Sequence, residues 1–371
     1  MPKDKGMNII DYAKNEMRTF AEYPFNNVDS VILSKLSCVR FNGLVGGVEE
    51  NRSPVVLSDL LKAEWFVSMT GGIFNEEKVL QLIFALCASP RFRNIKLNYY
   101  EENTDKGIHE QFAATTFILP FGKAYLAFRG TDPSLIGWQE DCNMTFMNAV
   151  PSQLAALEYI EKVASLIDLP LILGGHSKGG NVAVYGGAKA KERVKHRIEA
   201  IYDHDGPGFR EEVMKQKCFD DVIPKIRKTV PECSIVGMLL DTRADYRIVA
   251  SNERYLSQHD TFSWIVDKDD FVYLAHLSKQ ATAIQTSMKE FLSKVPDKDK
   301  ERFVESVFQI ISAGGADMVQ EISEERINNL MAMIGAIKDV TPETRKFLVQ
   351  TVKLLTTLSV KNLHDINTKK R

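Results

Sequence analysis

Ser177 lies in a short segment whose residue types and spacing suit a catalytic nucleophile. Residues 175–179 read G-H-S-K-G, which is the G-x-S-x-G spacing. An apolar run at 171–173 precedes the segment, and a helical pattern from about 181 to 194 follows it. On such a strand-to-helix turn the chain bends too tightly for side chains beside the serine, and the bend exposes the hydroxyl group. We therefore predict that Ser177 is a nucleophile.

A serine hydroxyl attacks slowly unless a base removes its proton and a third group orients that base. On strand-to-helix turns of this kind the chain order is serine, then Asp or Glu, then histidine. His259 lies in a polar loop after the last predicted strand and satisfies that order. His276 and His364 fall in helical patterns, whereas His196 and His204 precede the expected acid. His259 is therefore the predicted base.

The acid that orients His259 is expected where a strand ends beside the serine. Asp241 directly follows the apolar run at 234–240, so it is the first choice. Asp245 competes with it, and Asp205 is the next candidate if both fail. Aspartate is also common in ordinary turns, so sequence position alone leaves the choice open.

An oxyanion hole needs two backbone N–H groups directed at the developing negative charge. The residue after the nucleophile supplies one of them, which makes Lys178 the first predicted donor. The second is expected from an earlier loop, and residues 128–132 place a glycine directly after a predicted strand. Thr131 is the predicted donor there.

The elements that must position these residues follow an α/β pattern. Residues 1–90 have mainly helical spacing, and the helix predicted over 28–36 is its clearest part. From about residue 151 helices and strands alternate, which favours a parallel sheet covered by helices on both faces. The predicted strands are 95–99, a hairpin of 114–119 with 124–128, then 171–173, 198–202, 234–240 and 246–250.

This pattern predicts an α/β-hydrolase fold with a mostly parallel central sheet flanked by helices. We expect a helical leading segment over 1–90 packed on the main domain and an α/β-hydrolase core over 91–275. A helical appendage of about four helices should occupy 276–371, where it is a candidate lid over the active site.

The composition excludes several other classes of protein. The 371 residues include 47 basic and 49 acidic side chains, a formal net charge of -2, so no overall field favours nucleic acid. The five cysteines are widely spaced, and neither metal-ligand spacing nor a phosphate-binding glycine loop occurs. We expect no cofactor, no metal and no integral membrane contact. Residues 1–20 lack the apolar region of a signal peptide, which predicts a cytoplasmic protein.

Several of these segments resemble known families. Residues 125–132 resemble the A-F-R-G-T segment that precedes the oxyanion residue in class three, fungal-type lipases. The wider set is similar to a bacterial family of lipase-like α/β-hydrolases, the Mbeg-like proteins, over roughly residues 10–275. The segments that carry this resemblance are 24–30, 137–141, 175–181, 205–209, 236–240 and 258–264. The resemblance implies the same fold and a hydrolase chemistry, without a particular substrate.

The predicted function is therefore that of a serine hydrolase of the lipase or esterase kind. Ser177 would attack an acyl carbonyl, His259 would carry the proton, and Asp241 would orient His259. The expected substrate is a small-molecule acyl ester or lipid. A peptidase or acyltransferase with the same triad is an alternative, because a triad does not select the acyl acceptor. A noncatalytic binding protein that keeps the fold is another.

Overall fold

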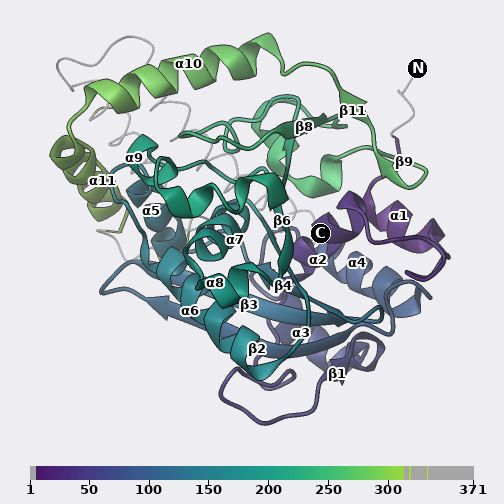
Figure 1. Ribbon diagram of the computed structural model, residues 1–371. Coiled ribbons are helices and arrows are strands. Elements are labelled where there is room, and N and C mark those ends of the chain that lie inside the picture. Colours follow the sequence, from purple (N-terminus) through teal and green to yellow (C-terminus); the bar gives the residue numbers. More distant parts are fainter. Residues whose placement is uncertain (1–5, 313–316, 319–331, 333–371) are drawn as a thin grey trace, which may run out of the picture.

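The computed structural model describes residues 6–312, 317–318 and 332. A nine-stranded sheet runs through the middle of the molecule in the order β1-β2-β3-β4-β5-β6-β7-β8-β11 (Figure 1). The strands are β1 Val55–Val56, β2 Lys96–Asp105, β3 Glu110–Leu119, β4 Lys123–Phe128, β5 Leu171–His176, β6 Ile198–His204, β7 Ile226–Pro231, β8 Tyr246–Val249 and β11 Tyr273–Leu274. A small separate hairpin pairs β9 (Val266–Asp267) with β10 (Asp270–Phe271).

The sheet is mixed, with a parallel centre. Strands β4 to β8 pair in parallel, and all the other neighbours pair antiparallel. The predicted α/β-hydrolase fold is confirmed, but the predicted "mostly parallel" sheet holds only for these five central strands. The predicted hairpin is β3 with β4, joined through a glycine at position 122 whose φ is 78°.

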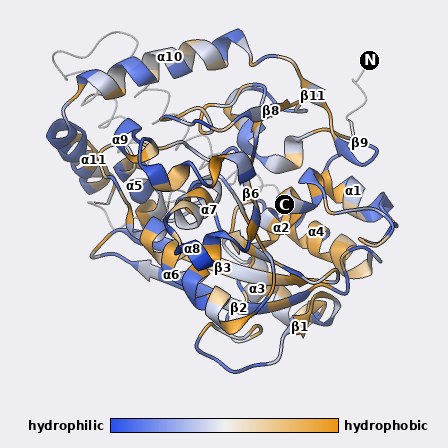
Figure 2. Cartoon of the chain, in the orientation of Figure 1, coloured by the Kyte–Doolittle hydropathy of each residue, from blue (hydrophilic) through white to orange (hydrophobic). Residues whose placement is uncertain are grey.

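Helices cover both faces of the sheet. Helices α6 and α7 contact the strands on one face, and α2 contacts β4, β5 and β6. The helices are α1 Ile9–Asn15, α2 Asn27–Leu36, α3 Phe66–Thr70, α4 Glu76–Ala88, α5 Leu135–Asn143, α6 Pro151–Leu166, α7 Lys178–Lys189, α8 Glu192–Lys195, α9 Glu211–Met214, α10 Lys279–Lys294 and α11 Asp297–Ser312. Figure 2 shows hydrophobic residues along α2 and α4 and a largely hydrophilic α11.

Two hydrophobic cores lie on the two faces, as the alternation of β-strand side chains requires. Tyr125 and Ala127 of β4 belong to a core shared with α1, α2 and α4. Leu126 and Phe128 of the same strand belong to the core shared with α6 and α7. Every residue of this strand from 124 to 128 is therefore buried, which explains the apolar run in the sequence.

The N-terminal helices also pack against residues that come near the end of the α/β core in the sequence. Their core includes residues from 262 to 271 as well as residues from 9 to 97. The backbone N–H of Val266 donates to the carbonyl of Met7, and the Asn26 side chain donates to the carbonyl of Asp269. The leading segment and the last part of the core thus form one packed layer.

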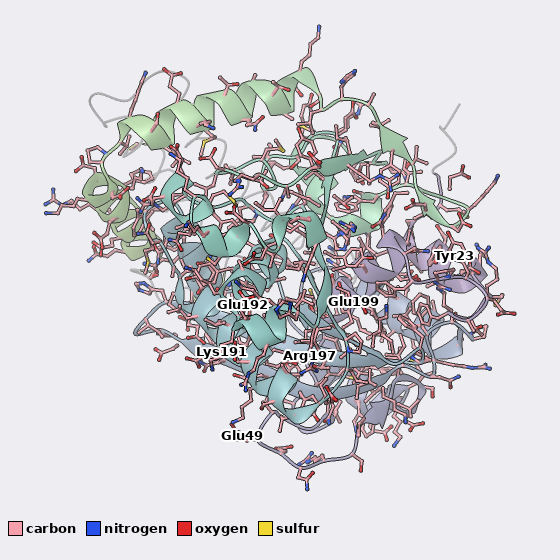
Figure 3. The ribbon with its side chains drawn as sticks, viewed as in Figure 1. Tyr23, Glu49, Lys191, Glu192, Arg197 and Glu199 are labelled. Carbon is pink, nitrogen blue, oxygen red and sulfur yellow. The ribbon has the colours of Figure 1, made fainter. Side chains whose placement is uncertain are left out.

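Local sequence signals set the helix ends. The Asn26 side chain accepts from the N–H groups of Val28 and Asp29, and the Asp29 carboxylate accepts from the N–H of Asn26, so α2 begins with a capping box. Proline at position 151 starts α6. Arg197, labelled in Figure 3, caps the C-terminal end of α6. Its guanidinium group donates to the carbonyls of Ala164 in the last turn and of Ile167 and Leu169 just beyond it.

One predicted strand is wrong. Residues 234–240 form turns, and the strand in this part of the sheet is β7, which lies earlier in the chain. Its residues 227–229 are Arg, Lys and Thr, which a search for apolar runs passes over. Lys228 is nevertheless buried within the sheet, because its ammonium group forms an ion pair with the Asp203 carboxylate at 2.6 Å.

The appendage expected over 276–371 is described only as far as α10 and α11, together with residues 317–318 and 332. Its other predicted helices lie outside the described residues. Helix α10 runs along one side of the molecule, beyond α9 and β8 (Figure 1). It is attached to the loop after β7, because Ser278 N–H donates to the Glu232 carbonyl and Lys289 pairs with Asp241.

Candidate active site

Ser177 stands on a strained turn between β5 and α7. Its φ is 57° and its ψ is -132°, a conformation that residues other than glycine rarely adopt. The flanking glycines are required by contact: a Cβ on Gly175 would lie 2.2 Å from the Gly179 carbonyl carbon. A Cβ on Gly179 would lie 2.1 Å from the Phe128 carbonyl oxygen. The expected strand, turn and helix are therefore all present around this serine.

His259 forms a hydrogen bond with Asp205. The Nδ1 atom of His259 lies 2.6 Å from Oδ2 of Asp205, whose side chain is fully buried. Because a carboxylate only accepts, Nδ1 carries the hydrogen and Nε2 is left with a free lone pair. This is the tautomer that can remove a proton from a serine hydroxyl group.

Asp205 is itself held firmly. It follows β6 directly and has a φ of 52°. Its second oxygen, Oδ1, accepts from the Ser234 hydroxyl at 2.5 Å and from the Gly237 N–H at 3.2 Å. Both carboxylate oxygens are thus occupied, and the one facing His259 has a fixed direction.

A buried ion pair supports the loop that carries Asp205. The Lys228 ammonium group donates to Oδ2 of Asp203 and to the carbonyl of Gly206, both at 2.6 Å. The other oxygen of Asp203 accepts from the Gly206 N–H at 2.9 Å. Residues on both sides of Asp205 are therefore anchored to β7.

The prediction that Asp241 orients His259 is wrong. Oδ1 of Asp241 lies 2.7 Å from the ammonium group of Lys289 on α10, and its backbone pairs with Phe209. The error follows from the misplaced strand, because 234–240 does not end at the edge of the sheet that carries Ser177. Asp245 is exposed and directly precedes β8, so it lies at the start of a parallel strand and not at its end.

A detectable signal for Asp205 was present in the sequence. The run at 198–202 is predicted to be a strand. In the structure this strand, β6, ends at residue 204, and Asp205 follows it directly. In a parallel sheet, residues just beyond neighbouring strands share one edge. The register shows this directly, since His176 of β5 pairs with His204 of β6.

The loop that holds Thr131 touches the serine turn. A Cβ on Gly130 would lie 3.3 Å from the Cβ of Ser177 and 2.6 Å from the carbonyl oxygen of His176. The Thr131 hydroxyl donates to Oδ2 of Asp141 on α5 at 2.5 Å. Burial raises the pKa of Asp141 to about 6, against the opposing effects of the Lys178 charge and the Thr131 hydrogen bond. The loop of Thr131 therefore contacts the turn of Ser177, and the oxyanion role of Thr131 stays a prediction.

Lys178 is the first residue of α7, and its side chain is buried. Its ammonium group donates to the carbonyl of Gln111 at 2.7 Å, to Oε1 of Gln111 at 2.8 Å and to Oε2 of Glu140 at 2.8 Å. All three hydrogens are used within the protein. The ammonium group is therefore fully engaged within the protein, and only the backbone N–H of Lys178 is a candidate for binding substrate.

Sequence reasoning missed His176, the residue before the nucleophile. Its Nε2–H donates to the backbone carbonyl of His259 at 2.8 Å, and the two imidazole rings lie 4.5 Å apart. Burial, followed by the charge of His259, holds the pKa of His176 well below its usual range. His176 is thus a neutral donor that supports the loop of His259. In the sequence, the only sign that His176 has a role in the site is its position inside the G-x-S-x-G segment at 175–179.

Neither a metal nor a membrane span is indicated among the described residues. Within them, no three His, Cys, Asp or Glu side chains are grouped so as to hold a metal ion. No helix in residues 6–312, 317–318 and 332 has both the length and the apolar character that crossing a bilayer requires.

The segment that carries these residues matches a known family. Residues 86–309, more than half of the chain, match the Mbeg1-like family. The chain belongs to the Mbeg1-like family. The matched part of this Mbeg1-like protein contains Ser177, Asp205 and His259, together with the loop of Thr131.

Solved structures of fungal lipases show a distant likeness to this Mbeg1-like protein. The Rhizomucor miehei lipase propeptide complex is 16% identical with a TM-score of 0.34, and the match covers 52% of this chain and 66% of that chain. The lipase from Rhizopus microsporus var. chinensis is 15% identical with a TM-score of 0.34, covering 64% and 87% of the two chains. A comparison with curated proteins found no match.

Proposed function

We propose that this Mbeg1-like protein is a serine hydrolase that cleaves carboxylic esters or related acyl substrates. The observation that carries the proposal is the 2.6 Å hydrogen bond between His259 and the buried Asp205, on the loop beside the strained turn of Ser177. Burying a carboxylate is costly unless it is fully bonded, and Asp205 accepts from His259, Ser234 and Gly237.

The proposed chemistry begins with Ser177. Its Oγ attacks the acyl carbonyl carbon while Nε2 of His259 takes the hydroxyl proton, and Asp205 stabilises the imidazolium that forms. The tetrahedral intermediate then collapses, the C–O bond to the alcohol breaks, and His259 returns the proton to the departing oxygen. Water, activated by the same histidine, hydrolyses the acyl-enzyme and regenerates Ser177.

The negative charge of the tetrahedral intermediate requires donors that are already in place. The backbone N–H groups of Lys178 and Thr131 are the proposed pair, because one starts α7 directly after Ser177 and the other lies on the loop in contact with it. The proposed substrate is a small acyl ester or a lipid.

A fluorophosphonate probe tests the proposal, because it phosphonylates only an activated serine. The wild-type protein should be labelled, peptide mass spectrometry should place the adduct on Ser177, and p-nitrophenyl esters should be hydrolysed. Ser177→Ala should abolish both signals. Ser165→Ala, on the exposed side of α6, is the matched control and should behave as wild type. A folded wild-type protein that neither reacts with the probe nor hydrolyses esters would favour a noncatalytic binding protein.

A further inference from the structure

Helix α5 places two adjacent carboxylates against the two proposed oxyanion donors. Glu140 accepts from the Lys178 ammonium group, and Asp141 accepts from the Thr131 hydroxyl. Thr131 and Lys178 lie on different segments, after β4 and after β5. A single helix, α5, therefore contacts the side chains of both residues whose backbone N–H groups are the proposed oxyanion donors.

The contact between Glu140 and Lys178 is a fully buried ion pair. The side chains of Lys178 and Glu140 are 1% and 0% exposed. Oε1 of Glu140 accepts from the Ser152 N–H at 2.7 Å, and Oε2 also accepts from the Gln111 N–H at 3.1 Å. Burying two charges is costly, and apolar side chains would fill this space at less cost. Such a pair is better explained by the geometry that it imposes than by its net contribution to stability.

Gln111 joins this ion pair to the other side of the hole. Its Oε1 accepts from the Lys178 ammonium group at 2.8 Å and from the backbone N–H of Asp132 at 3.4 Å. Asp132 directly follows Thr131. The side chain of Gln111, at the start of β3, therefore links the turn of Ser177 with the loop of Thr131 by two hydrogen bonds.

We propose that Glu140 and Gln111 are positioning residues, which act through Lys178 to hold the two oxyanion donors at a fixed separation before substrate binds. This inference rests on the proposed hydrolase function. The ammonium group of Lys178 has no hydrogen left for substrate, so its effect on the reaction is indirect. Anchoring the side chain to β3 and α5 restricts the rotation of the peptide unit whose N–H faces the reacting carbonyl.

The expected effect is specific to the transition state. Donors that meet the charge of the tetrahedral intermediate stabilise it more than the substrate, so displacing them lowers kcat and leaves KM nearly unchanged. Removing one donor outright costs about a hundredfold to a thousandfold in kcat. A displaced donor should cost about tenfold or more on the same basis.

Glu140→Gln tests the inference, because it removes the charge and keeps the shape. Asp29→Asn is the matched control: Asp29 is also 0% exposed, and its carboxylate bonds to Tyr12, Asn26 and Arg91, none of which belongs to the proposed active site. We would measure kcat and KM for a p-nitrophenyl ester, normalised to sites titrated with fluorophosphonate. We would also measure the affinity for a trifluoromethyl ketone, which forms a tetrahedral adduct with serine.

Glu140→Gln should lower kcat and weaken the ketone adduct by the same factor, about tenfold or more, at constant KM. Asp29→Asn should lower the melting temperature and leave kcat unchanged. If Glu140→Gln folds poorly, the double variant Lys178→Met with Glu140→Gln removes both buried charges and should still show the low kcat.

Two results would overturn the positioning role: wild-type kcat per titrated site in these variants, or an equal loss of kcat in Asp29→Asn. A wild-type protein that shows no labelling would instead contradict the hydrolase function itself.

Discussion

Ser177 and Asp205 occupy equivalent positions just beyond the ends of two neighbouring parallel strands. His176 and His204 are register partners on β5 and β6, so the next residue on each strand is Ser177 and Asp205. Both have positive φ values, 57° and 52°. The backbone N–H of Ser177 also donates to the His204 carbonyl at 2.9 Å. The proposed nucleophile and acid are therefore fixed relative to each other by the sheet itself.

Asp205→Asn should lower ester turnover by about ten-thousand-fold, because the amide cannot stabilise the imidazolium and favours the wrong tautomer of His259. Asp241→Asn should change turnover by less than about tenfold, since its partner is Lys289 in a mostly exposed pair. Steady-state hydrolysis of a p-nitrophenyl ester measures both. The opposite ranking would return the acid to Asp241.

His259→Ala should abolish fluorophosphonate labelling, because an unassisted serine hydroxyl reacts slowly. His276→Ala, an exposed position after β11, serves as the control and should be labelled at the wild-type rate. Gel fluorescence over a time course gives the two rates. Labelling of His259→Ala at the wild-type rate would show that another group activates the serine.

Asp141→Asn should raise the stability of the protein near neutral pH. The pKa of Asp141 is about 6 in the folded state against an ordinary value of 3.8, so the folded state binds the proton more tightly than the unfolded chain does. Ionising this carboxyl therefore costs stability, and the cost appears as pH rises from about 4 to 6. Its upper bound is about 3 kcal/mol.

Thermal unfolding of wild type and Asp141→Asn between pH 4 and pH 8 measures that cost. The asparagine variant should be the more stable protein above pH 6, and the difference should vanish towards pH 4. Asp220→Asn, at an exposed position, is the control and should show no such trend. A gain that grows as pH falls would contradict the raised pKa.

Lys228→Met should destabilise the fold by about 3 to 5 kcal/mol, because it leaves the buried Asp203 without its cation. Adding Asp203→Asn should recover part of the loss, since the uncompensated charge is then gone. Chemical denaturation of the two variants measures the difference. Equal stability of the single and the double variant would mean that the ion pair is not the main interaction at this position.

The fold and part of the site could be predicted from the sequence. The features that could be predicted are those that depend on residues next to each other in the chain. The glycines at 175 and 179 and the apolar run before them are local, so the turn of Ser177 was predictable. The partner of His259 depends on which strands are neighbours. The sequence did not predict that arrangement for two reasons. Strand β7 includes Arg, Lys and Thr at 227–229, and the apolar residues at 234–240 have the composition of a strand although they form turns.

The buried network behind the site could not be predicted for a similar reason. Lys178, Glu140 and Gln111 are far apart in the sequence, and each has the residue type of an ordinary surface position. The folded structure buries all three residues and joins them by hydrogen bonds. His176 is comparable, because its contacts are with the loop of His259, 83 residues later in the chain.

The single packed layer formed by the N-terminal helices and the residues near 266 has a consequence for synthesis of the chain. The hydrogen bond from Asn26 to Asp269 joins residues 243 positions apart. At a translation rate of about 5 to 20 residues per second, the first helices leave the ribosome roughly 12 to 50 seconds before their partners exist. During that interval the apolar faces of α1, α2 and α4 lack their final cover, and contacts of such long sequence separation form slowly. The beginning of the chain is therefore exposed to non-native contacts throughout that interval.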